Sequence, residues 1–499
     1  MNLLHAFKWR RALLAVLAVL AVSTSGAAWP ANNQPNWYSR TEGTGIPDLL
    51  QDPLFTRPEL DASVMHLPDA SRLDCTRPTD TAQALSLIEV VDLSLCNNPQ
   101  VAAAWASIKV QAAALGEARA SYLPTLNGSM SSLESTVEYP ENSALNSKNM
   151  GATSYLGLSW RLLDFAARYN NNAVAKYQLE SAIFNRDATL QKVMLSVVGA
   201  YYDVVTYRAN YQLRLEAVEF AFATVGSAKL RLRMGAATLN DVLVAESALA
   251  KAKLTAARAK GDYDKAMAVL YQSMGLPSDS PIRLSFSDDV RATQATDNLQ
   301  ALIDQVKTEH PAIKSAQLQL NAALSKVDAL RTEGLPSIDF SYNYYQNGYP
   351  NQSLQTTKTN TTNVGFTLNI PFFEGFARTY KIRGAQAQAE QAQYQVDSVT
   401  QQVLVDVVKS HADSASSVSN IAFADGLLQA ATQAYESSKR RYELGVADLP
   451  ELLSAQNNLV DAKQEHARCQ AEWRSSSLKL VAAVGQLGHQ QFTGSSNPQ

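Results

Sequence analysis

Residues 164–168 read Asp-Phe-Ala-Ala-Arg, and residues 374–378 read Glu-Gly-Phe-Ala-Arg, 210 positions further along the chain. The dipeptide Asn-Pro at 98–99 has a counterpart in His-Pro at 310–311, where proline suits the first position of a helix. An offset that stays nearly constant over this length indicates an internal duplication. Each copy is predicted to form a helix, a strand pair, a very long helix and a final helix, in that order.

The long helices are predicted from two segments without proline. Residues 166–234 and 377–444 are rich in Ala, Leu, Gln, Lys and Arg. About 70 helical residues span roughly 100 Å, and helices of this length are stable only when packed along partners, usually as coiled coils. Gly235 and Gly445 follow them and are expected to cap them in the left-handed conformation, so that the next helix of each copy returns antiparallel.

Apolar and polar residues alternate between the short and the long helix of each copy. The alternation covers residues 156–162, 338–345 and 363–370, and a fourth, less regular strand is expected near Leu126. A period of two indicates strands with one apolar and one polar face. The strands are therefore expected to separate two different environments.

Polar links join these strands at 138–153 and 347–362, and both links are expected to be loops. Strands that face lipid on one side and water on the other, with long external loops, have this pattern. The alternative is an amphipathic hairpin packed on the core of a soluble protein. Four strands cannot close a membrane barrel, for which about eight are needed. Three copies sharing one twelve-stranded barrel would solve this problem.

The composition excludes some classes of protein. The chain has 499 residues, of which 46% are hydrophobic and 18% charged, and its formal net charge is −3. No basic stripe is present, so we expect no nucleic-acid partner. Residues 1–27 are predicted to be a signal peptide, for which we favour the general secretory route. The pair Arg10-Arg11 leaves twin-arginine export as the alternative. No other run reaches about 18 apolar residues, so any membrane insertion is expected to use strands.

Reactive residues are few. Cys75 and Cys96 predict a disulfide in an exported protein, with two buried thiols as the alternative, and Cys469 is expected to be a small core residue. The six histidines show no metal-ligand spacing, and we find no nucleophile motif or phosphate-binding glycine loop. We therefore expect a protein that is not an enzyme and uses no cofactor or metal.

These features divide the chain into five parts. They are a signal peptide (1–27), an N-terminal arm (28–83), a first repeat (84–290), a second repeat (299–488) and a flexible C-terminal tail (489–499).

The motifs that recur in both halves resemble the TolC family of outer-membrane efflux and secretion ducts, over about residues 84–488. They are the Asn-Pro and His-Pro helix starts, the Leu-Pro pairs at 123–124 and 335–336, Phe372-Phe373-Glu374-Gly375, and the tip sequences 231–245 and 441–455. Residues 95–100 and 104–106 are most similar to the branch that exports toxins by type I secretion, of the cyclolysin-secretion type.

The resemblance implies an α+β membrane protein that assembles as a homotrimer. Its twelve-stranded β-barrel would lie in the lipid of the outer membrane, and twelve long helices would form a tunnel through the periplasm. A periplasmic adaptor would connect it to an inner-membrane ABC transporter or a proton-driven pump, which would supply the energy. The duct itself would perform no chemistry.

The resemblance further implies a periplasmic gate at the hairpin ends. Glu451 matches the first of two acidic positions of the family, while Ser454 replaces the second, and Asp448 precedes them in the same tip. Three copies of Glu451 would form a carboxylate ring that favours cations. The alternative is a solvated carboxylate that stabilises a helix N-terminus.

Polar links that hold the gate closed are also implied by the resemblance. Asp241 matches the acidic partner and Tyr442 the phenol, but the basic position is Ala447, for which Arg441 is a candidate substitute. Ordinary coiled-coil packing is the alternative role for Tyr442.

The leading hypothesis is an outer-membrane duct for a large secreted protein, such as a toxin of the RTX type. A duct for drugs or metals is the alternative within the family. A periplasmic adaptor would also have long helical hairpins, but it should lack the duplication and the amphipathic strands. A hydrolytic enzyme on a coiled-coil stalk is disfavoured because the sequence holds no catalytic motif.

Overall fold

The computed structural model describes residues 54, 56, 84–277, 282–285, 298–346 and 359–485. The predicted signal peptide, the C-terminal tail, Cys75 and all but two residues of the N-terminal arm lie outside the described residues. The described chain forms two compact units. The first contains residues 110–179 and 324–386, and the second contains most of the remaining helices.

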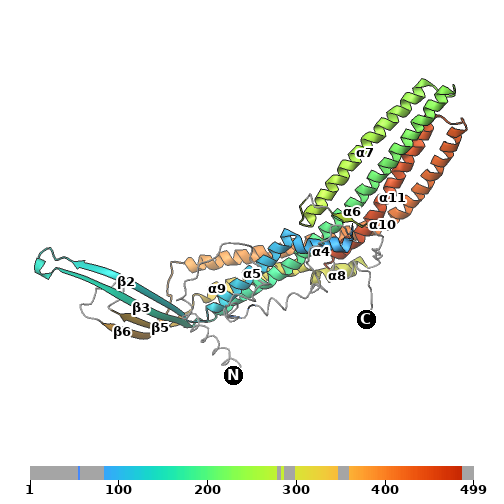
Figure 1. Ribbon diagram of the computed structural model, residues 1–499. Helices are drawn as coiled ribbons and strands as arrows, with labels where there is room; N and C mark the ends of the chain where they lie inside the picture. The colour runs from blue at the N-terminus through green and yellow to red at the C-terminus, as the bar shows by residue number, and fades with distance from the viewer. Residues whose placement is uncertain are drawn as a thin grey trace. The chain divides into compact units, whose positions relative to one another are not determined.

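The predicted duplication is visible in helix pairs of equal length (Figure 1). The pairs are α4 (Leu87–Asn97) and α8 (Leu299–Glu309) with 11 residues, α5 (Pro99–Ala120) and α9 (Pro311–Thr332) with 22, α6 (Ala167–Arg233) and α10 (Ala377–Glu443) with 67, and α7 (Leu239–Ser273) and α11 (Leu449–Ala483) with 35. The helices α4 and α8 were not predicted from the sequence. Among the described residues, none of the helices combines the length and the apolar character needed to cross a membrane.

Asn98 and His310 end the unpredicted helices and begin the next ones. Each closes α4 or α8 by donating its backbone N–H to a carbonyl four residues earlier, at 2.8 Å and 3.1 Å. Each also accepts a backbone N–H with its side chain, Asn98 from Gln100 at 2.8 Å and His310 from Ala312 at 3.3 Å. The residue before a proline avoids helical geometry, so one residue can separate two helices.

Hydrophobic cores hold the second unit together. One cluster includes Val197 and Val198 of α6 with Leu270 and Met274, and a second joins α8, α9, α10 and α11 around Val407. A two-stranded parallel ladder of β1 (Ala84–Leu85) and β4 (Arg283–Leu284) lies in the same unit. The two halves therefore bury equivalent faces of their short and long helices.

The first unit contains a four-stranded antiparallel sheet in the order β2-β3-β5-β6 (Figure 1). The strands are β2 (Thr125–Val137), β3 (Ser147–Leu163), β5 (Ser337–Gln346) and β6 (Asn360–Asn369). The predicted strand pairs are confirmed, and β2 and β6 are the edge strands.

One predicted loop is wrong. Residues 147–153, which we expected within the link 138–153, belong to β3 and pair with residues 131–137 of β2. Backbone hydrogen bonds build this part of the ladder, so it needs no alternation of apolar side chains. In the second copy, β6 begins at Asn360, inside the expected link, and residues 347–358 lie outside the described residues.

One face of β6 exposes large apolar side chains. Val364, Phe366 and Leu368 are 62%, 71% and 59% exposed, and Phe372 beyond the strand is 90% exposed. Such a contiguous apolar face is uncommon on a soluble protein and marks a surface that contacts lipid or another chain.

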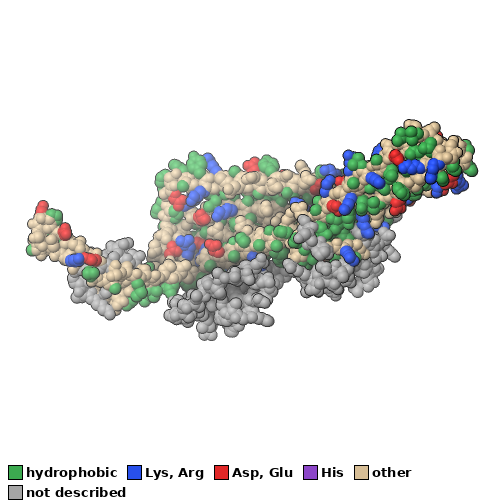
Figure 2. Space-filling model, turned by 45° about the horizontal axis from the view of Figure 1, so that its top comes forward, with side chains coloured by type: hydrophobic (Ala, Val, Ile, Leu, Met, Phe, Trp, Pro, Cys, Tyr) green, Lys and Arg blue, Asp and Glu red, His purple; other side chains and the backbone are tan. Residues whose placement is uncertain are grey.

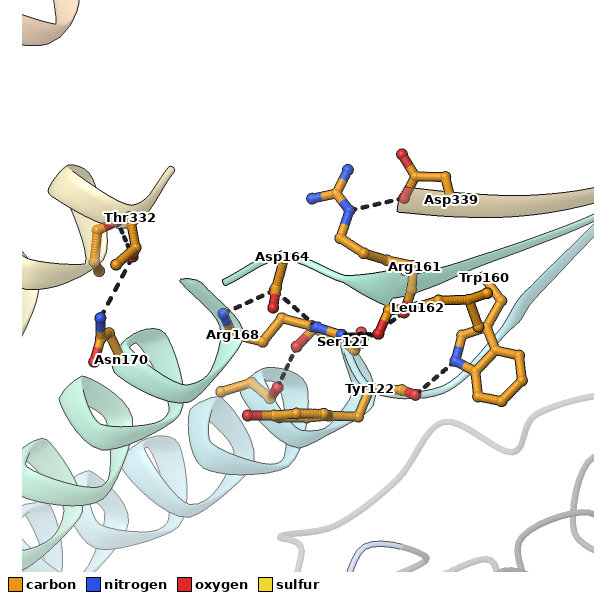
Figure 3. Close-up of polar contacts among 12 residues, drawn as sticks. Ser121, Tyr122, Trp160, Arg161, Leu162, Asp164, Arg168, Asn170, Thr332 and Asp339 are labelled. Carbon is orange, nitrogen blue, oxygen red and sulfur yellow. Dashed lines mark hydrogen bonds and ion pairs between the residues drawn. The ribbon is translucent and has the colours of Figure 1, made fainter. Parts of the chain in front are cut away.

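The repeated motif at 164–168 forms the turn from β3 into α6 (Figure 3). Asp164 accepts hydrogen bonds from the backbone N–H and the Nε of Arg168, at 3.0 Å and 2.8 Å. The Arg168 guanidinium also donates to the carbonyl of Arg161 at 2.8 Å and lies 4.9 Å from the centre of the Tyr122 ring. Arg378 pairs with Glu374 in the second copy and lies against Gly334, the counterpart of Tyr122. The motif is thus repeated because each strand-to-helix turn needs one acid and one arginine.

Candidate functional site

The candidate gate residues lie at the turns that join α6 to α7 and α10 to α11. Both turns contain a glycine with positive φ, 71° at Gly235 and 79° at Gly445. This confirms the predicted left-handed caps, a conformation that costs glycine little. The hairpin ends carry hydrophobic, basic and acidic side chains next to each other (Figure 2).

The N-terminus of α7 is closed by a capping box. The Thr238 hydroxyl accepts the backbone N–H of Asp241 at 3.2 Å, and the Asp241 carboxylate accepts the backbone N–H of Thr238 at 2.7 Å. These hydrogen bonds lower the pKa of Asp241, first through the backbone N–H and then through the hydroxyl of Thr238. In the described residues, no hydrogen bond joins Asp241 to Tyr442. The carboxylate is therefore committed to its own helix terminus.

The N-terminus of α11 uses its two acids differently. Asp448 accepts the backbone N–H of Glu451 at 2.9 Å and so acts as the N-cap. Glu451 forms an ion pair with Arg441 across the same hairpin, and the Ser438 hydroxyl donates to it at 3.5 Å. Ser454 is exposed one turn further on. The Glu451 carboxylate therefore already has a counter-charge within its own chain.

Tyr442 links the two hairpins. It belongs to α10 but is only 8% exposed, because it packs with side chains of both hairpins. The buried members of this cluster are Val225 and Ala228 of α6, Val242 and Ala245 of α7, and Leu449 and Leu452 of α11. Its aromatic ring is therefore part of the packing between the hairpins.

Arg231 is a residue of this site that the sequence analysis missed. Its guanidinium carbon lies 4.1 Å from the centre of the Tyr442 ring. Its Nη2 donates to the backbone carbonyls of Tyr442 and Glu443, the latter at 3.2 Å. The available signal was the repeat itself, because Arg231 occupies the position that corresponds to Arg441.

Other candidate residues lie away from the hairpin ends. Cys96 lies in α4 and is disulfide-bonded. Its predicted partner Cys75 lies outside the described residues, so the pairing of Cys75 with Cys96 stays a prediction. Cys469 is a free, buried cysteine in α11, as predicted.

Comparisons with known proteins agree with this architecture. The chain is 34% identical to Protein CyaE of Bordetella pertussis, over 84% of this chain and 88% of that protein. It is 22% identical to the proteases secretion protein PrtF of Dickeya chrysanthemi, over 83% and 90%. The crystal structure of the outer membrane protein VceC of Vibrio cholerae has the same fold, with a TM-score of 0.69 and 20% identity over 81% and 96%. The family model of outer membrane efflux proteins matches residues 90–276 and 302–486. The chain therefore belongs to the outer membrane efflux protein family, and its predicted resemblance to the TolC family is confirmed.

Proposed function

We propose that this outer-membrane channel protein is the duct of a type I secretion system and exports a large protein, such as a toxin of the RTX type. The observation that carries the proposal is its 34% identity to CyaE over 84% of the chain. PrtF, whose name describes protease secretion, is a more distant relative with similar coverage. Family members are channels rather than enzymes, so the chain contributes a passage and no catalysis.

A trimer is the assembly that the edges of the sheet favour. The strands β2 and β6 are both edges in one chain and leave ladder groups unpaired. Unpaired edges are not tolerated in lipid, whereas three copies would supply twelve strands and close the barrel. The exposed apolar face of β6 would then contact outer-membrane lipid.

The long helices are proposed to form the periplasmic tunnel of the same trimer. A helix of 67 residues spans roughly 100 Å, which suits a passage across the periplasm. Phe222 of α6 and Phe423 of α10 are exposed in one chain, and neighbouring copies or an adaptor would cover them.

The hairpin ends are proposed to be the gate of this tunnel. Asp241, Tyr442, Asp448, Glu451 and Ser454 would be its residues. A periplasmic adaptor and an inner-membrane ABC transporter would be the partners that open it, with a proton-driven pump as the alternative to the transporter.

Secreted proteins of a strain with a clean deletion of this gene test the proposal. We expect one or a few large proteins to disappear from the culture supernatant and to return when the gene is supplied on a plasmid. An unchanged supernatant together with new sensitivity to drugs or metals would instead identify a duct for small molecules.

Purification provides the structural test. Trimers in detergent with a strong helical circular dichroism signal would support the assembly. A monomer that is soluble without detergent would contradict it.

A further inference from the structure

Arg231 and Arg441 occupy corresponding positions in the two repeats but make different contacts. Both lie in the last turn of a 67-residue helix, near the carbonyl groups that the helix leaves unpaired. Arg441 pairs with Glu451 and stays within its own hairpin. Arg231 leaves its hairpin and donates to the carbonyls that end the long helix of the other hairpin.

The acids at the start of the following helices explain the difference. Asp241 is one methylene shorter than Glu451, and both the N–H and the hydroxyl of Thr238 donate to its carboxylate. In the second hairpin, Asp448 supplies the cap, which leaves Glu451 available for Arg441. In the part of the chain that the structure describes, Arg231 therefore has no acidic partner in its own hairpin.

The partners of Arg231 in the other hairpin are well suited to a guanidinium. The carbonyls of Tyr442 and Glu443 lie at the negative end of the α10 dipole. The Tyr442 ring, held in the cluster between the hairpins, offers its face to the cation at 4.1 Å. The corresponding position in the first hairpin is Leu232, so Arg441 would find no aromatic ring there.

We propose that Arg231 fastens the two hairpins of one chain to each other at their ends and so keeps the entrance of the duct narrow, while Arg441 has no such role. The proposal rests on the duct function proposed above. In this proposal the Arg231 contacts with Tyr442 and Glu443 hold the entrance closed. They replace the link between Asp241 and Tyr442 that was expected from the sequence. Opening then requires the loss of the Arg231 contacts with the second hairpin.

The variants Arg231→Gln and Arg441→Gln form a matched pair, because they make the same chemical change at corresponding positions. Amide hydrogen exchange of the purified full-length protein in detergent is measured over residues 227–238 and 437–448. Arg231→Gln should accelerate exchange in both segments, roughly tenfold, as expected for the loss of a half-buried cation–aromatic contact together with its hydrogen bonds to two carbonyls. Arg441→Gln should change only its own hairpin.

Conductance in planar lipid bilayers measures the consequence for the entrance. We expect Arg231→Gln to conduct several times more than the parent protein, whereas Arg441→Gln, which frees a carboxylate without separating the hairpins, should change the conductance far less. Tyr442→Leu, which introduces the residue found at the corresponding position 232, should also raise conductance. This variant keeps the test decisive if Arg231→Gln fails to fold.

The outcomes separate the two proposals. If the parent protein conducts ions but Arg231→Gln matches Arg441→Gln in both exchange and conductance, the fastening role is wrong and the duct stands. If the parent protein forms no pore, the proposed duct function is wrong. The hydrogen-exchange experiment alone then decides whether Arg231 joins the two hairpins.

Discussion

The Nδ1 atom of His310 accepts the backbone N–H of Ala312 at 3.3 Å, so the imidazole is an acceptor and therefore neutral. Burial lowers the pKa of His310 to about 4, with the nearby Asp406 opposing this shift. The unfolded chain gains a proton on this histidine as the pH falls through 6.5, whereas the folded chain does not until about pH 4. Stability should therefore decrease over this range, by roughly 3 kcal/mol per chain at most.

The variant His310→Asn tests this pH dependence. Asn98 performs the same capping role in the first repeat, so asparagine should keep the cap at position 310. We expect the midpoint of thermal unfolding to fall less between pH 6.5 and pH 4 than in the parent protein. Circular dichroism measures the midpoint, and His411→Asn is the control. Equal pH profiles of His310→Asn and the parent would contradict the prediction.

The ion pair between Arg441 and Glu451 predicts the charge selectivity of the entrance. Loss of the arginine in Arg441→Gln should leave three carboxylates without a counter-charge in the proposed trimer. We expect the ratio of cation to anion permeability to rise about twofold, a modest effect because exposed charges are screened by salt. Reversal potentials in a salt gradient measure it. The double variant Arg441→Gln/Glu451→Gln should return to the parent value.

The turn between β3 and α6 holds Phe165 at φ 47°, a conformation that favours glycine. The corresponding residue of the second repeat is Gly375, at φ 58°. Phe165→Gly should therefore relieve strain and increase the free energy of unfolding by roughly 1 kcal/mol. Denaturant unfolding in detergent measures the change. Phe165→Ala is the control, because alanine keeps the Cβ atom that causes the strain and should give no gain.

A buried ion pair predicts a large loss of stability. Arg186 and Asp187 form an ion pair in which both side chains are buried, and the guanidinium lies 4.6 Å from the centre of the Trp105 ring. Asp187→Ala should lower the free energy of unfolding by up to roughly 3–5 kcal/mol, because the buried guanidinium loses one of its charged contacts. The double variant Arg186→Met/Asp187→Ala should recover most of this loss. Equal losses in the free energy of unfolding for the single and the double variant would contradict the interpretation.

The order and the ends of the long elements could be predicted from the sequence because they depend on local chemistry. Proline at 99 and 311 begins helices, and glycine at 235 and 445 ends hairpin arms, since each residue type restricts or permits particular backbone angles. The helices α4 and α8 escaped prediction because one residue separates each from the next helix. Residues 147–153 escaped because backbone pairing, and not side-chain alternation, builds that part of the strand.

The sequence by itself therefore determined the duplication, the long hairpins, the amphipathic strands and the family. The tertiary structure decided how the repeated gate residues are used. Arg231 and Arg441 look equivalent in the sequence, yet one contacts the other hairpin and the other contacts its own. The reason lies in the helix caps. The Asp241 carboxylate is held by the cap of its own helix, so Arg231 donates to the other hairpin. In the second hairpin Asp448 forms the cap, so Glu451 stays available for a charge-assisted hydrogen bond with Arg441.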